Sequence, residues 1–273
     1  MSPYLDQPGP IALAHRGGGA ETPENSRAAV EGTLALGYRY LETDVRATAD
    51  GVVVLHHDAR LERTTDGEGP ISARTWADVA RLRDASGRRP VRLDEVLADF
   101  GGLRLNIDAK DDGVVAPLLR VIDEAGAHER VCLASFSDAR LRRIRTATGG
   151  AVATSLGQAE CARLVLAARG RGRLAGTLAR AGALRWGVPV PDGPPAARAV
   201  CVQVPERYRG VPVVTPRFLA LAHRLGLAVH VWTVDDAADM HRLLDLGVDG
   251  LVTDRPTTLR AVLRERGQWH EGL

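Results

Sequence analysis

Residues 11–45 read IALAHRGGGA ETPENSRAAV EGTLALGYRY LETDV, and this stretch contains a complete strand–helix–strand pattern. The apolar runs at its two ends are short, which is typical of buried parallel strands. Between them, Thr22 followed by Pro23 predicts the start of a helix, and Gly37 predicts its end. The stretch therefore predicts one βαβ unit, in which a helix connects two parallel strands.

The same alternation of short apolar runs and longer amphipathic stretches continues along the chain. Candidate buried strands occur at 11–14, 38–45, 103–108, 131–136, 151–155, 199–204, 228–234 and 250–253. Helical patterns follow most of them, at 93–100, 114–125, 138–146, 217–225, 237–246 and 257–266. Eight such units in 273 residues predict a (β/α)8 TIM barrel, because single barrels of this α/β class commonly contain about 250 residues. An open doubly wound sheet is the structural alternative.

Two segments interrupt this alternation. Residues 58–90 contain turn and polar residues where one helix is due, so we predict a small insertion after the second strand. Residues 169–198 are rich in glycine, arginine and proline, which predicts an irregular connection. We expect one barrel domain over residues 1–273.

Composition and charge exclude several classes of protein. The chain is 45% hydrophobic and 26% charged, which indicates a globular protein. Its net charge of +2 is too small for non-specific binding to nucleic acid. Its three widely separated cysteines predict neither a disulfide framework nor a zinc site. Residues 1–10 lack a signal-peptide pattern and no apolar run reaches about 18 residues, so we expect a cytoplasmic protein without an integral membrane segment.

Polar residues recur with a period of two in the second and third predicted strands. Glu42 and Asp44 therefore point to one side of their strand. Asn106, Asp108 and Lys110 share a side of the next strand by the same rule. Since the active sites of TIM barrels lie at the C-terminal ends of the strands, we expect these side chains to converge at the mouth of the barrel.

Three carboxylates in one partly buried site repel one another, so their joint ionisation is costly unless a cation or protons intervene. Oxygen ligands favour calcium, magnesium or manganese over zinc. We therefore predict that Glu42, Asp44 and Asp108 hold a divalent metal ion, with open positions for water and a substrate phosphate. For any one of these acids, a surface salt bridge is the alternative.

Two histidines stand at the ends of apolar runs. His15 ends the first predicted strand, and His57 follows the run at 52–55. Histidine is the usual general acid or base near neutral pH, so a pair at one site would move protons in both directions. A structural role is the alternative for each of them.

Lys110 is the only lysine among the 36 lysine and arginine residues of the chain, and all the others are arginine. A compact ammonium is distinguished from a planar guanidinium only in a confined site. We therefore predict that Lys110 belongs to the functional site. The three glycines that follow Arg16 predict either a turn or a close approach of the backbone to a phosphate.

Together, these residues resemble the glycerophosphodiester phosphodiesterase family. The resemblance rests on an ordered set of short motifs that extends over nearly the whole chain. They are His15-Arg16-Gly17, Pro23-Glu24-Asn25, Glu42-Thr43-Asp44, His57-Asp58 followed by Leu61-Glu62-Arg63-Thr64-Thr65, Ile107-Asp108-Ala109-Lys110, Ser135-Phe136, Trp232-Thr233-Val234, and Asp249-Gly250 followed by Thr253-Asp254-Arg255-Pro256. Each motif is weak alone, but their joint order and spacing are specific.

The resemblance implies metal-dependent hydrolysis of glycerophosphodiesters to glycerol 3-phosphate and an alcohol. It implies that the three carboxylates hold the metal and that His15 and His57 act as acid and base. It also implies that Arg16 and Lys110 bind the phosphate and that Trp232 borders the glycerol group. The expected partner is a small-molecule substrate, and the oligomeric state stays undetermined.

The resemblance also assigns supporting positions and reveals one departure. Glu24, Asn25 and Asp254 match positions that support the site. The third acid is usually glutamate in this family, whereas here it is Asp108, which is one methylene shorter. Either the strand lies closer to the metal or a water intervenes, and the metal affinity or preference is expected to differ.

The sequence does not exclude three other functions. A lysophospholipase D-like enzyme would use the same site on lipid substrates, with a wider apolar mouth. A Schiff-base aldolase would use Lys110 as its nucleophile. A non-catalytic phosphodiester-binding barrel is the third alternative, because a fold does not imply an activity.

Overall fold

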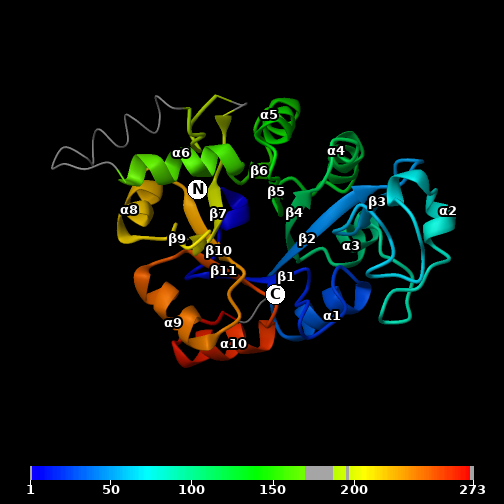
Figure 1. The fold of residues 1–273 in the computed structure, drawn as a ribbon, viewed down its shortest axis with the longest axis horizontal. Helices are drawn as coiled ribbons and strands as arrows, with labels where there is room; N and C mark the ends of the chain where they lie inside the picture. Colours follow the sequence, from blue (N-terminus) through cyan, green and yellow to red (C-terminus); the bar gives the residue numbers. More distant parts are fainter. Residues whose placement is uncertain (1, 170–186, 195–196, 271–273) are drawn as a thin grey trace.

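Eight parallel strands form a nearly closed barrel (Figure 1). The computed structural model describes residues 2–169, 187–194 and 197–270. The strands are β1 (Ile11–His15), β2 (Tyr40–Ala47), β4 (Arg104–Ala109), β5 (Val131–Ala134), β6 (Ala153–Thr154), β7 (Cys201–Pro205), β10 (Ala228–Trp232) and β11 (Gly250–Thr253). Their spatial order is β6, β5, β4, β2, β1, β11, β10, β7, and a bridge between Ser155 and Cys201 joins the two ends. The predicted TIM barrel is confirmed, and the open doubly wound sheet is excluded.

Helices surround the barrel and cover the outer face of its strands (Figure 1). They are α1 (Arg27–Ala35), α3 (Leu93–Asp99), α4 (Val115–Glu124), α5 (Asp138–Ala147), α6 (Gln158–Arg169), α8 (Pro216–Arg224), α9 (Ala237–Leu246) and α10 (Pro256–Glu265). Apolar side chains join the two layers: Leu118 and Ile122 of α4 are buried in one cluster with Leu105 and Ile107 of β4. Within the described ranges, no helix has both the length and the apolar character of a membrane span.

The first helix begins later than the sequence predicts. Ser26 is the N-cap of α1, and its side chain accepts a hydrogen bond from a backbone amide of the first turn. Asn25 directly before it has a φ of 51°, which lies outside the helical range. The hydroxyl of Thr22 donates instead to carbonyls of the glycine turn, so the predicted start at Thr22 is wrong. The predicted end is confirmed at Gly37, whose φ is 81°.

The sequence did not predict helix α6. Its apolar residues occur on every side of the helix, so no single stripe marks a buried face. Contacts with α8 and with the preceding helix α5 position it instead. The predicted irregular connection at 169–198 lies mostly outside the described residues.

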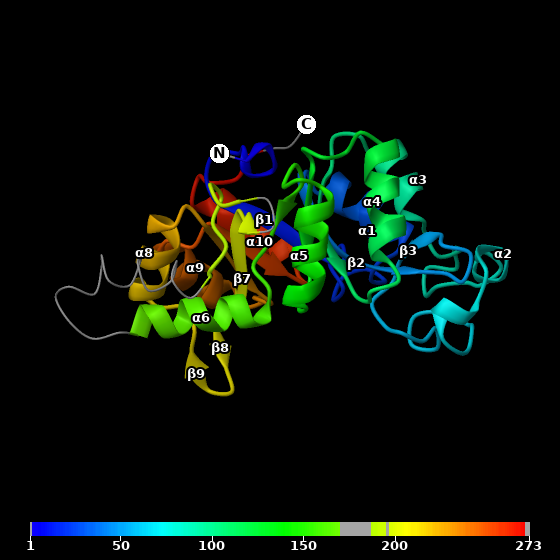
Figure 2. The same ribbon diagram turned by 90° about the horizontal axis from the view of Figure 1, so that it is seen from above.

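The segment after β2 forms a small lobe at one end of the molecule (Figure 2). It begins with β3 (Val53–Leu55), which pairs antiparallel with β2, and continues through η2 (Ile71–Ala73) and α2 (Trp76–Val79). A separate apolar cluster of Val54, Leu61, Ile71 and Val79 lies inside it. The insertion predicted over 58–90 falls in this lobe.

Two further short elements lie at opposite ends of the barrel. η1 (Pro3–Leu5) precedes β1, and its buried Tyr4 packs edge-on against Tyr40 at 5.3 Å between ring centroids. The hairpin of β8 (Arg207–Tyr208) and β9 (Val211–Pro212) follows the C-terminal end of β7 and projects beside α6 (Figure 2). The hairpin therefore lies at the end of the barrel where the strands terminate.

A buried ion pair connects α5, β6 and α6 where the barrel closes. Arg145 is fully buried, and its guanidinium nitrogens lie 2.9 Å from both carboxylate oxygens of Glu160. The guanidinium also donates to Thr154 Oγ1 and to the Ser155 carbonyl, and Glu160 accepts from the Gly157 amide. Because the two charged groups satisfy each other and their neighbours, the pair holds α6 in place without leaving a buried charge unpaired.

Replacing Arg145 by alanine leaves the Glu160 carboxylate buried without its partner. We expect Arg145→Ala to lower the free energy of unfolding by about 3–5 kcal/mol, measured by urea unfolding followed by circular dichroism. Arg143→Ala on the same helix removes only an exposed ion pair with Asp112, so it is expected to leave the stability nearly unchanged. Equal losses in the two variants would contradict this role of the buried pair.

Candidate active site

The register of three neighbouring strands brings the predicted polar residues into two rows. β1 pairs with β2 so that His15 lies beside Glu42, and β2 pairs with β4 so that Glu42 lies beside Asn106. Two residues further along, Asp44 lies beside Asp108. Because side chains two residues apart share a face of a strand, both rows point into the barrel near the C-terminal ends of the strands.

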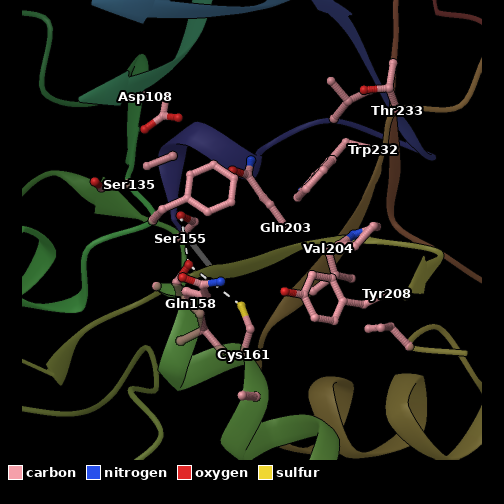
Figure 3. A pocket seen from close by; sticks show the side chains of 18 of the residues that line it. Asp108, Ser135, Ser155, Gln158, Cys161, Gln203, Val204, Tyr208, Trp232 and Thr233 are labelled. Atoms are coloured by element: carbon pink, nitrogen blue, oxygen red, sulfur yellow. Dashed lines mark hydrogen bonds between the residues drawn. The ribbon is translucent and has the colours of Figure 1, made fainter. Parts of the chain in front are cut away.

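A cavity of about 720 Å³ opens at this end of the barrel. Every residue that the sequence assigned to the site lines it: His15, Arg16, Glu42, Asp44, His57, Asp108, Lys110 and Trp232. Figure 3 shows Asp108 and Trp232 on different walls of this cavity. The structure thus brings together side chains from β1, β2, β4, β10 and the segments that follow them.

Two basic side chains contact the carboxylates. Lys110 Nζ is 2.7 Å from Asp44 Oδ1 and 2.7 Å from Asp108 Oδ2. Arg16 Nε is 3.1 Å from Asp44 Oδ2. Burial alone would lower the pKa of Lys110, but the carboxylates of Asp108 and Asp44 outweigh burial and raise it. Lys110 is therefore an ammonium at neutral pH, whereas a Schiff-base aldolase needs a neutral amine as its nucleophile.

The third carboxylate, Glu42, is less well compensated. Burial, together with the nearby Asp44 carboxylate, raises the pKa of Glu42 to about 7. Its Oε2 accepts a hydrogen bond from the Arg16 amide and lies 3.8 Å from His15 Nε2. The raised pKa means that the ionised form of Glu42 is destabilised by its surroundings, and a bound cation would stabilise it.

The donor atoms fit a hard divalent cation by their chemistry. All three predicted ligands offer carboxylate oxygens, and Asp108 Oδ1 is buried without a hydrogen-bond partner. Within the described ranges, no three His, Cys, Asp or Glu side chains already form a group that could hold a metal ion. The ammonium contacts one oxygen of each aspartate, Asp44 Oδ1 and Asp108 Oδ2, and leaves Asp108 Oδ1 without a partner.

A carboxylate orients each of the two histidines. His15 Nδ1 is 2.8 Å from Asp254 Oδ1, and His57 Nδ1 is 2.6 Å from Asp58 Oδ1. Nε2 is then the nitrogen that each ring has left for proton transfer. Burial would lower the pKa of His15, but the hydrogen bond to Asp254 and the charge of Glu42 raise it. Both imidazoles therefore have the orientation that acid–base chemistry needs.

The predicted supporting residues contact the site directly. Asn25 Nδ2 donates to Asp44 Oδ2 at 2.9 Å, and Asn25 Oδ1 accepts from Thr43 Oγ1. Glu24 Oε1 accepts from Arg16 Nη1 at 3.0 Å. These contacts hold the Asp44 carboxylate and the Arg16 guanidinium in position.

The glycines after Arg16 form a tight turn that packs against two helices. Gly17 has a φ of 80°, and a β-carbon there would lie 2.5 Å from the β-carbon of Ala29 in α1. Gly18 has a φ of 90°, and its β-carbon would lie 2.6 Å from Pro256 Cγ in α10. Of the two roles that the sequence left open, the geometry shows the turn.

Several residues of the site were not identified from the sequence. Asp58 is the partner of His57, but the pattern of a His-Asp dipeptide does not show that the two side chains bond. Phe136 lies 6.1 Å from Trp232 between ring centroids, and only its place in the Ser135-Phe136 motif pointed to it. The walls supplied by α6 and by the β8–β9 hairpin had no sequence signal, because segments distant in the chain form them.

Comparison with known proteins matches this chain to one family. Residues 15–258 match the model of the glycerophosphoryl diester phosphodiesterase family. A protein of Mycobacterium tuberculosis, named a probable glycerophosphodiester phosphodiesterase 2, is 39% identical over 267 residues, which cover 97% of this chain and 95% of that protein. A glycerophosphodiester phosphodiesterase of Caldanaerobacter subterraneus subsp. tengcongensis is 29% identical over 273 residues, which cover 94% of this chain and 99% of that protein.

A solved structure has the same fold. The phosphodiesterase of Oleispira antarctica, solved in complex with its product sn-glycerol-3-phosphate, matches with a TM-score of 0.71 at 19% identity. The match covers 94% of this chain and 97% of that protein. Since the family match extends over nearly the whole chain, this protein belongs to the glycerophosphoryl diester phosphodiesterase family and is a phosphoric diester hydrolase.

Proposed function

We propose that the protein hydrolyses glycerophosphodiesters to glycerol 3-phosphate and an alcohol, and that this reaction requires a divalent cation. The observation that carries the proposal is the single cavity in which carboxylates, basic groups and imidazoles from separate strands meet. Membership of the family supports the substrate class. The oxygen donors favour calcium, magnesium or manganese as the cation.

The charged residues of the cavity have two roles in this proposal. Glu42, Asp44 and Asp108 hold the cation, which when bound offsets the charge of the phosphodiester and polarises its oxygens. Arg16 and Lys110 bind the phosphate. Their positive charges are in place before the reaction begins, so they stabilise the charge that builds up on the phosphate oxygens in the transition state.

The two histidines move protons, and Trp232 borders the glycerol group. One imidazole deprotonates the nucleophile and the other protonates the departing alkoxide. A carboxylate holds Nδ1 of both His15 and His57, so each ring has Nε2 for either of the two roles. The nucleophile is water, or a substrate hydroxyl that first forms a cyclic phosphate. Phosphorus NMR during turnover distinguishes these routes by the presence of the cyclic species.

Chelation is expected to abolish activity, because the carboxylates then repel the phosphate with no cation to offset them. A coupled assay for released glycerol 3-phosphate over a panel of glycerophosphodiesters measures this, with chelator and then with calcium, magnesium or manganese added back. Glu42→Gln is expected to weaken binding of the added metal by at least about tenfold in titration calorimetry. Asp99→Asn, at an exposed acid paired with Arg27, is the matched control.

Two results would contradict this part of the proposal. Full activity in the presence of chelator would exclude a required cation. If no glycerol 3-phosphate is released from any diester with any added ion, and the diesters still bind, the result would instead favour a non-catalytic phosphodiester-binding barrel.

His57→Ala is expected to lower kcat by about 10²–10⁴, because one of the two proton transfers loses its catalyst. Metal binding in titration calorimetry should be retained, since His57 is not among the proposed ligands. His128→Ala serves as the control, because His128 pairs with Asp123 outside the cavity. Near-normal turnover of His57→Ala with metal bound would show that the acid–base assignment is wrong.

A further inference from the structure

The cavity extends well beyond the charged residues. Its volume of about 720 Å³ is typical of pockets that enclose drug-sized ligands, and glycerol 3-phosphate is much smaller than that. The additional walls come from the loop after β5, from α6 and from the β8–β9 hairpin. In Figure 3, Cys161 of α6 and Tyr208 of the hairpin lie across the cavity from each other, at the end away from Asp108.

Exposed apolar side chains gather on these additional walls. Among the described residues, the exposed large apolar side chains are Phe136 (58% exposed), Leu166 (58%), Tyr208 (52%) and Val211 (43%). A single exposed apolar residue is ordinary on a protein surface. These four come from three separate elements and all line one cavity, and such a concentration indicates a site for an apolar group.

Specific contacts fix the apolar walls relative to one another. Arg169 Nη2, at the end of α6, donates a hydrogen bond of 2.8 Å to the Pro212 carbonyl in β9. Phe136 and Trp232 meet edge to face, with 6.1 Å between their ring centroids. The loop after β5 is thus connected to β10, and α6 to the hairpin. The Gln158 amide at the start of α6 also donates to the Phe136 carbonyl, which joins the two pairs of walls into one groove.

This groove begins beside the residue that borders glycerol in the proposed function. Trp232 contacts Phe136 directly, and Leu166 and Tyr208 line the cavity on α6 and the hairpin. Asp108, which Lys110 contacts, lies at the other end of the cavity from Tyr208 and Cys161 (Figure 3). A hydrocarbon chain attached to the glycerol would therefore extend from Trp232 along the apolar walls while the phosphate stays at the basic groups.

We therefore propose that the preferred substrates are lysophospholipids, in which an acyl chain esterifies one glycerol hydroxyl of the glycerophosphodiester. This inference rests on the proposed function and names the substrate class of the same site. In the net reaction one water is consumed: its hydroxyl is added to phosphorus, the bond from phosphorus to the headgroup oxygen breaks, and the proton goes to the departing alkoxide. The products are a monoacylglycerol phosphate and the free alcohol, and the acyl ester stays intact.

The test compares each headgroup in an unacylated form and in forms that carry chains of six, eight or ten carbons, all below the critical micelle concentration. Release of the headgroup alcohol by the metal-loaded enzyme is measured for every form. The ratio of kcat/KM between acylated and unacylated forms then reports the effect of the chain alone. We expect kcat/KM to rise about fourfold for each methylene that the groove buries.

Variants of the groove locate this effect. Leu166→Ser and Tyr208→Ser each remove apolar surface from one wall, and we expect each to lower the ratio by about tenfold or more. Leu119→Ser on α4 changes a partly buried leucine outside the cavity and is expected to keep the wild-type ratio. Because the ratio is measured within one variant, a partial loss of folded protein does not affect it.

The possible outcomes separate this inference from the proposed function. If no diester is hydrolysed in either form, the proposed function fails and this inference fails with it. If unacylated diesters are hydrolysed and the chain brings no increase, the inference is wrong and the proposed function stands. An increase that persists in Leu166→Ser and Tyr208→Ser would overturn the assignment to this groove. If the increase is absent below the critical micelle concentration and appears only when the same substrates are assayed above it, the enzyme binds a lipid surface, and a groove for single chains is overturned.

Discussion

The parallel register between β2 and β4 is the constraint on which the active site depends. It places Asp44 beside Asp108 and turns both side chains into the barrel. The alternate positions carry Leu41 and Ile107, which are buried in the cluster between the strands and the helices. A shift by one residue would turn the carboxylates toward the helices and the apolar side chains into the polar mouth. Burial of the outer apolar residues therefore holds the inner carboxylates in place.

The charge balance of the site follows from this register. Three acidic side chains are forced close together in a largely buried place, where an isolated negative charge is costly. The only lysine of the chain offsets part of this charge by contacting Asp44 and Asp108 at once. A compact ammonium on a flexible stem can contact two separate carboxylates in this way, whereas a planar guanidinium prefers a fixed bidentate geometry. The same arrangement that stabilises the carboxylates also keeps positive charge ready for a phosphate.

The cavity has two parts, and each is formed by a different portion of the fold. The ends of β1, β2 and β4 carry the charged part, so the rigid barrel fixes its geometry. The loop after β5, α6 and the β8–β9 hairpin form the apolar part, which lies outside the barrel strands. In barrels of this kind the strand ends hold the chemistry, and the connecting segments vary the substrate. A change in these segments can therefore alter the group attached to the phosphodiester without changing the reaction at phosphorus.

The sequence by itself determined the barrel and the residues that gather in its mouth, because both depend on local patterns. Apolar runs marked the strands, and a period of two showed which side chains share a face. Local patterns missed the late start of α1, the existence of α6 and the apolar walls of the cavity. Asn25 leaves the helical conformation where it bonds to Asp44, Arg145 holds α6 through Glu160, and Arg169 of α6 bonds to the hairpin. Only the tertiary structure decided these features, because the energy of each side chain depends on the partner that the fold places next to it.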